Sequence, residues 1–75
     1  MTLSHCVPGD RVRVSAVDPD QNVSQRLFEL GFLPGAVVDV VHEAPFSKDP
    51  MAIRVRGTLI ALRRSEAELI RVEKT

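Results

Sequence analysis

The chain has no tryptophan, no tyrosine and a single cysteine among its 75 residues. One thiol, Cys6, cannot form an internal disulfide, and this favours a reducing compartment. No apolar run approaches the roughly 18 residues that a membrane-spanning helix needs. Residues 1–5 also lack the basic start and apolar centre of a signal peptide. The sequence therefore predicts a cytoplasmic protein that meets a membrane only through a partner.

The chain also lacks an excess of charge of either sign, because its formal net charge is zero. Sequence-independent nucleic-acid binding depends on clustered basic residues, so no nucleic-acid partner is expected. Residues 48–75 alone carry seven basic and four acidic side chains, which allows a basic face as the alternative to an ordinary mixed surface. The arginines that could form this face are Arg54, Arg56, Arg63, Arg64 and Arg71.

Motifs for catalysis are absent as well. No glycine-rich run precedes a Lys-Ser or Lys-Thr pair, as a P-loop requires, and there is no Gly-x-Ser-x-Gly elbow. Adjacent His5 and Cys6 could act as base and nucleophile, but chain neighbours rarely have that geometry. With His42 and Glu43 they are also the candidate metal ligands, although none has the spacing of a tight site. The sequence therefore predicts no catalytic residue, no cofactor and no metal ligand.

The chain does contain segments in which apolar and polar residues alternate. Val12 and Val14 alternate with Arg11 and Arg13, and the same period of two returns in several later segments. This period is typical of half-buried strands, whereas the unbroken apolar run at residues 59–62 indicates a strand buried on both faces. The strands are expected at residues 10–17, 37–43, 51–56, 59–62 and 70–73.

One helix is expected between the first two strands. The Asp-Pro-Asp-Gln segment at residues 18–21 is typical of a helix start, with Asp18 as the cap. Asn22 as the cap with Gln25 is a second possible register. Val23, Leu27 and Leu30 then form an apolar stripe at helical spacing. Phe28 falls off that stripe, so we expect it at the edge of the core or outside it.

These elements predict a mainly β fold with one short helix, a small closed barrel of about five strands, because closure removes exposed edges. Residues 65–68 add a one-turn helix with its own capping box. The whole chain is expected to form one domain, residues 1–75, with its core between about residues 8 and 73. The expected inward set is Val12, Val14, Leu27, Leu30, Val38, Val40, Ile53, Val55, Ile60, Leu62, Ala67, Ile70 and Val72.

The junction between the helix and the second strand is the most informative segment. Gly31 comes where a helix commonly ends, because glycine enters the left-handed region most easily. Pro34 and Gly35 then fit the two central positions of a type II turn. Gly57 marks a tight reversal between the third and fourth strands. We expect structural roles for all four.

Several large apolar residues remain that a thin core cannot hold. They either form a lid over one end of the barrel or a partly exposed patch with a basic rim, which is typical of a protein-binding surface. The candidate partner-binding residues are Phe28, Phe32, Leu33, Phe46 and Met51, with Arg54 and Arg63 on the rim.

Two motifs, in this order, resemble the FeoA family of small cytosolic proteins of bacterial ferrous-iron uptake. The first is Leu-x-x-Leu-Gly-Phe-x-Pro-Gly at residues 27–35, followed by Val38 and Val40. The second begins at Asp49-Pro50 and continues through Ile53, Val55 and Gly57 to Val72. The resemblance covers about residues 8–73, and the Phe-Ser-Lys of residues 46–48 departs from the glycine that the family often has before Asp-Pro.

The resemblance implies an SH3-like barrel with an inserted helix and no enzyme activity. It also implies a role as accessory or regulator beside FeoB, the membrane transporter with a cytosolic G-protein domain. Either motif alone also fits the SH3-like C-terminal domain of some metal-dependent repressors. The alternative is therefore a metal- or DNA-linked sensor domain, and open barrel edges would allow weak self-association as a third interpretation.

Overall fold

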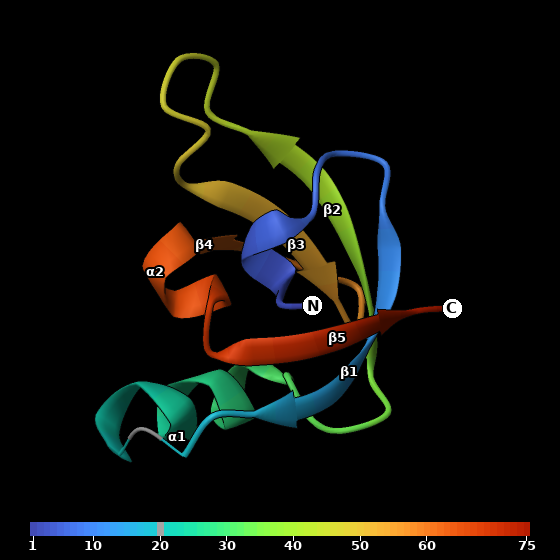
Figure 1. Cartoon of the computed structure of the whole chain (residues 1–75), viewed down its shortest axis with the longest axis vertical. Coiled ribbons are helices and arrows are strands. Elements are labelled where there is room, and N and C mark those ends of the chain that lie inside the picture. Colours follow the sequence, from blue (N-terminus) through green and yellow to red (C-terminus); the bar gives the residue numbers. More distant parts are fainter. Residues whose placement is uncertain (20) are drawn as a thin grey trace.

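A single five-stranded antiparallel sheet, with the strand order β4-β3-β2-β1-β5, forms the body of the protein in a computed structural model. The structure describes residues 1–19 and 21–75. Figure 1 shows the sheet curving around the core, with the short helix α2 and the 3-10 turn η1 across its open side and α1 at one end. The strands are β1 Arg11–Val17, β2 Val37–Glu43, β3 Met51–Val55, β4 Thr58–Leu62 and β5 Ile70–Lys74, and the helical elements are η1 Leu3–His5, α1 Gln21–Leu30 and α2 Arg64–Ala67.

The sheet bends at two irregularities in its register. One lies between Val14 and Ala16, where β1 pairs with β5, and the other between Val40 and His42, where β2 pairs with β3. A bulge of this kind kinks a strand and increases its twist, so a sheet of five short strands can wrap around a core. The expected mainly β fold of five strands with one inserted helix is confirmed.

Closure of the barrel differs from the sequence prediction. In the described residues β4 and β5 are the two edge strands of the sheet, and each pairs with one neighbouring strand. The edge of β5 also carries a bridge between Thr2 and Arg71. The fourth strand is not buried on both faces, because Leu59 is 57% exposed and faces solvent. An edge strand can be apolar without being buried. The apolar run at residues 59–62 therefore gave a wrong prediction of burial on both faces.

Helix α1 closes one end of the curved sheet. Its residue Leu27 is fully buried, Val23 and Leu30 pack partly buried against the core, and Phe28 is 40% exposed, as the helical stripe predicts. The helix begins at Gln21, after the start predicted with Asp18 as the cap and before the one predicted with Asn22 as the cap. Asp20 lies outside the described residues, as does the side chain of Gln21. A bilayer-crossing helix is not among the elements of the described chain.

The chain turns sharply after α1 and directs Phe32 into the core. Gly31 has a φ of 110°, and its N–H bonds to the carbonyl of Phe28 at 3.0 Å. The N–H of Phe32 returns to the carbonyl of Leu27, also at 3.0 Å, and the Phe32 ring is fully buried. Because a φ near 110° is open to glycine and disfavoured for other residues, this turn depends on Gly31.

The core also extends further toward the N-terminus than expected. Leu3 in η1 and Cys6 just after it are 0% and 1% exposed, so the core begins before residue 8. Leu30 and Ile60 of the expected inward set are half-buried rather than buried. The buried apolar side chains are Leu3, Cys6, Val12, Val14, Leu27, Phe32, Val38, Val40, Met51, Ile53, Val55, Leu62, Ala67, Ile70 and Val72.

The short helix α2 is capped in a different register from the one predicted. It starts at Arg64, and the carboxylate of Glu66 accepts the N–H of Arg63 at 3.0 Å. Ser65 is therefore inside the helix and is not its cap. The guanidinium of Arg26 on α1 also bonds to Glu66, which ties the two helices together.

Two phenylalanines of the same helix junction provide a matched test of this core. Phe32→Ala should lower the free energy of unfolding by about 3–5 kcal/mol, because it empties a fully buried site. Phe28→Ala should lower it by about 1 kcal/mol, because that ring is already two-fifths exposed. Urea unfolding of both variants measures the difference, and equal losses would contradict the assignment of Phe32 to the core.

Candidate functional site

The predicted apolar patch is only partly at the surface. Phe32 is 0% and Met51 is 1% exposed, so the expectation that they contact a partner is wrong. Phe32 is buried because Gly31 reverses the chain, and Met51 is buried because it opens β3 on its inward side. Both residues belong to the alternative that the sequence left open, in which large apolar side chains cover an end of the core.

The remaining candidates are exposed but do not lie together. Phe28 and Leu33 are 40% and 41% exposed and flank the end of α1, whereas Phe46 is 99% exposed in the loop between β2 and β3. Figure 1 shows α1 and this loop at opposite ends of the longest axis, along which the molecule extends 30 Å. The single patch expected from the sequence is therefore two separate features.

The first feature, which we call the junction surface, consists of Phe28, Leu33 and Val37 with Arg13 and Arg56 beside them. Val37 is 41% exposed and is paired with Arg13 on β1. Arg56 follows Val55, the partner of Val38, and its Cδ lies 3.1 Å from the position that a Cβ on Gly31 would take. Exposed apolar residues thus neighbour two arginines in the sheet and the helix junction, and apolar residues with basic neighbours are typical of protein-binding surfaces.

Backbone hydrogen bonds fix the junction surface to the sheet. The turn at Pro34 and Gly35 closes with the N–H of Ala36 on the carbonyl of Leu33 at 2.9 Å, and the φ of Gly35 is 92°, as a type II turn requires. Gly35 then donates to the carbonyl of Val14 at 2.7 Å, and Val14 donates to Ala36 at 2.8 Å. The exposed side chains are therefore presented by a backbone that is already ordered.

The two arginines predicted for the rim lie elsewhere. Arg54 is exposed on the outer face of β3, opposite Asp39 on β2 and Leu59 on β4, and Arg63 is exposed just before α2. Leu59 is the exposed apolar residue beside Arg54, and sequence reasoning missed it by treating its strand as buried. Gly57, with a φ of 80°, forms the turn between these two strands.

Charge on the outer face of the sheet is mostly positive. Asp39 is engaged, since the Nε of Arg11 donates to its Oδ1 at 2.7 Å, and this hydrogen bond lowers the pKa of the Asp39 carboxyl below its ordinary value. Among the outward residues of the strands, Glu73 is the other carboxylate. The exposed arginines at these positions are Arg11, Arg13, Arg54, Arg71 and, in the β3–β4 turn, Arg56.

Arg64, expected as a member of a basic face, is instead a structural clamp. Its side chain donates to the backbone carbonyls of Ser4 and Cys6 near η1 and, from Nε at 2.7 Å, to the carbonyl of Lys48. A further bond at 3.1 Å joins its guanidinium to the carboxylate of Glu43. One arginine therefore links the N-terminal turn, α2 and the β2–β3 loop.

The candidate metal ligands do not converge. No group of three or more His, Cys, Asp or Glu side chains suited to a metal ion occurs within residues 1–19 and 21–75. Cys6 is buried under η1, while His5 and His42 are exposed. Burial raises the pKa of the Cys6 thiol above its ordinary value of 9.0, and the nearby Asp10 carboxylate adds to the effect. This thiol is therefore protonated and unreactive at neutral pH.

Comparison with known proteins places these features in context. The family model described as FeoA domain matches residues 1–74. A fusion of Fe(2+) transport protein A with Fe(2+) transporter FeoB, from Porphyromonas gingivalis, is 34% identical over 73 residues. That alignment covers 97% of this chain and 8% of the fusion protein, so the chain spans a small part of that relative's length.

Solved structures of FeoA proteins have the same fold as this chain. Iron(II) transport protein A from Clostridium thermocellum matches with a TM-score of 0.92 and 35% identity, covering 100% of this chain and 46% of that one. FeoA from Stenotrophomonas maltophilia, described as an SH3 domain protein complexed with zinc, matches with a TM-score of 0.87 and 34% identity, covering 97% and 89%. A manganese-dependent transcriptional repressor has a similar fold at a TM-score of 0.87 and 16% identity.

The raised pKa of Cys6 predicts a pH dependence of stability. Because the folded thiol ionises at higher pH than the unfolded one, this group leaves stability unchanged below pH 9.0 and removes stability as the pH rises from there toward the folded pKa. Urea unfolding at several pH values should show this alkaline decline in the native chain. The decline should be smaller in Cys6→Ala, and equal pH slopes in both proteins would contradict the burial of the thiol.

Proposed function

The chain belongs to the FeoA family, and from this membership we propose that it is a non-enzymatic accessory protein of ferrous-iron uptake. It acts in the cytoplasm by docking on the cytosolic G-protein region of a FeoB-type transporter. The junction surface, residues Phe28, Leu33 and Val37 with Arg13 and Arg56, makes the contact. The membrane is reached only through this partner.

The observation that carries the proposal is the fusion in Porphyromonas gingivalis, where a segment similar to this chain is part of one polypeptide with FeoB. A covalent link holds two domains at a high effective concentration, so that even a weak contact is occupied. Fused or separate, the two domains associate only if each presents a binding surface to the other. The exposed apolar residues of this small domain are the candidates for such a surface.

The junction surface has the chemistry for such a contact. Its three apolar side chains are each about two-fifths exposed, and an ordered backbone presents them. Burial of such residues under a partner supplies affinity, while guanidinium groups at the edge set orientation and accelerate association with an acidic surface. We therefore expect binding to weaken as salt rises, since Arg13 and Arg56 stay near solvent at the rim.

The alternative, a metal- or DNA-linked sensor domain, has one specific observation in its favour, the shared fold with the manganese-dependent repressor. A likeness at 16% identity concerns the fold alone. Titration of the reduced chain with ferrous or zinc ions, and with duplex DNA at two salt concentrations, tests this alternative. Stoichiometric metal binding through His5, Cys6 or His42 would favour the sensor over the accessory protein.

Two leucines allow a matched test of the docking surface. Leu33→Asp should weaken binding to the FeoB-type transporter by tenfold or more, because it places a carboxylate in the apolar part of the junction surface. Leu59→Asp, on the edge strand β4 and 57% exposed against 41% for Leu33, should leave the affinity within about twofold. Calorimetric titration against the transporter in nanodiscs measures both, and circular dichroism confirms that both variants fold.

Equal affinities of the two variants would remove the junction surface from the proposal. The absence of binding by the unchanged chain, with nucleotide-free and nucleotide-loaded transporter alike, would overturn the proposed function itself.

A further inference from the structure

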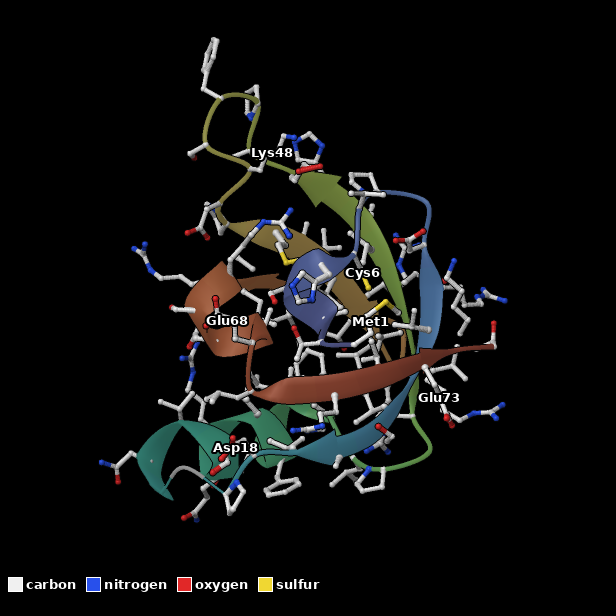
Figure 2. All side chains as sticks on the ribbon, in the orientation of Figure 1. Met1, Cys6, Asp18, Lys48, Glu68 and Glu73 are labelled. Atoms are coloured by element: carbon white, nitrogen blue, oxygen red, sulfur yellow. The ribbon has the colours of Figure 1, made fainter. Side chains whose placement is uncertain are left out.

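The β2–β3 loop presents the most exposed apolar residue of the described chain. Phe46 is 99% exposed, whereas the other large apolar residues at the surface reach 57% at most. The loop stands away from the sheet at the end of the molecule opposite α1, as Figures 1 and 2 show, with Lys48 labelled within it. Nothing in residues 1–19 and 21–75 covers this ring, so it adds little to the stability of the isolated chain.

The loop is nonetheless an ordered structure. The N–H of Lys48 bonds to the carbonyl of Ala44 at 2.9 Å, which closes a five-residue turn with Phe46 at its centre. The N–H of Ala44 bonds to the carbonyl of Pro50 at 3.1 Å, and the hydroxyl of Ser47 bonds to the carbonyl of Asp49 at 2.8 Å. Lys48 has a φ of 59°, an uncommon backbone conformation that the surrounding bonds hold in place.

Arg64 fixes this turn to the body of the protein. Its side chain bonds to the Lys48 carbonyl and the Glu43 carboxylate, and its backbone N–H bonds to the carboxylate of Asp49 at 3.0 Å. The same guanidinium reaches the carbonyls of Ser4 and Cys6, near a turn that is buried against the core. Both ends of the loop are therefore anchored, and the position of Phe46 is set before any partner arrives.

We propose that Phe46 is a preorganised anchor that inserts into an apolar pocket of a protein partner, at a surface separate from the one that the junction surface contacts. The inference builds on the proposed function, so the partner is the FeoB-type transporter. An aromatic ring on an ordered loop loses little conformational entropy on binding, and such rings in pockets are frequent hot spots. Arg64 is then the positioning residue that holds the anchor in place.

Other occupants fit this loop less well. A second copy of the chain is a poor match, because no pocket that could receive the ring is found on residues 1–19 and 21–75. Two loop tips in contact would also bury far less than the roughly 800 Å² per partner of a stable interface. A membrane is a poor match too, because the loop has one aromatic and one lysine, and stable membrane binding takes a larger apolar face or a basic cluster.

The two contacts lie at opposite ends of a domain that extends 30 Å along its longest axis. Contacts at both ends therefore reach parts of the transporter surface that are far apart, and the domain bridges them. Binding at both ends is expected to be sensitive to the distance between those parts.

Site-specific photo-crosslinking tests this inference. The photoreactive residue p-benzoylphenylalanine replaces Phe46, Phe28 or Leu59 in turn, and each chain is irradiated with the full-length FeoB-type transporter in nanodiscs or with empty nanodiscs of the same lipid. We expect crosslinks to the transporter from position 46 and from position 28, at different peptides, and none from position 59. Phe46→Ser should weaken binding at least tenfold, while Leu59→Ser should leave it unchanged.

Arg64→Met tests the positioning role. It should weaken binding when Phe46 is present and add nothing when combined with Phe46→Ser, because a residue that acts by holding the ring has no effect once the ring is gone. An additive loss in the double variant would overturn the positioning role. Amide hydrogen exchange of the core strands serves as the control for folding of each variant.

The outcomes separate the two proposals. If position 28 crosslinks but position 46 does not, and Phe46→Ser binds normally, the anchor is overturned and the docking surface stands. Crosslinks from position 46 to lipid in empty nanodiscs, or to a second copy of the chain, would also overturn the proposal that Phe46 is an anchor for the transporter. If the unchanged chain does not bind the transporter, the proposed function fails and the anchor fails with it.

Discussion

The left-handed turn at the end of α1 is the constraint on which the rest of the structure depends. Gly31 adopts a φ of 110°, and a Cβ at this residue would lie 3.1 Å from the Cδ of Arg56 and 3.5 Å from a methyl group of Val55. This turn sends Phe32 into the core and leaves its neighbours Phe28 and Leu33 at the surface. A side chain at residue 31 would strain the backbone and push against Arg56. The burial of Phe32 and the proposed docking surface therefore both depend on the absence of a Cβ atom at this residue.

A single arginine has the corresponding role at the other end of the molecule. Arg64 joins the N-terminal turn, α2 and the β2–β3 loop through bonds to three carbonyls and to Glu43. In a domain with so small a core, hydrogen bonds to a charged group contribute a substantial part of local order. The protein thus has a compact centre and two ordered ends, and exposed aromatic side chains occur at both ends.

Period-two alternation was sufficient to predict four of the five strands, because inward and outward residues differ in polarity along them, whereas β4 was predicted from its unbroken apolar run. The alternation could not place Phe32, which lies beyond the end of a periodic segment, where the path of the chain in three dimensions decides burial. Met51 has the same inward phase as Ile53 and Val55, so the alternation itself favours its burial, and its assignment to the partner surface departed from that pattern. The apolar run of β4 misplaced Leu59, since an uncharged edge strand and a buried strand have the same composition. The clamp formed by Arg64 joins segments up to 60 residues apart, and no local pattern in the sequence indicates such a contact.

The structure of the chain bound to a full-length FeoB-type transporter would test the central claim most directly, through the accessible area that each side chain loses. The account predicts that Phe28, Leu33 and Phe46 become buried against two different surfaces of the transporter, while Leu59 on the outer edge of the sheet stays exposed. A complex in which the outer face of the sheet is covered, and both ends of the domain remain in solvent, would contradict it.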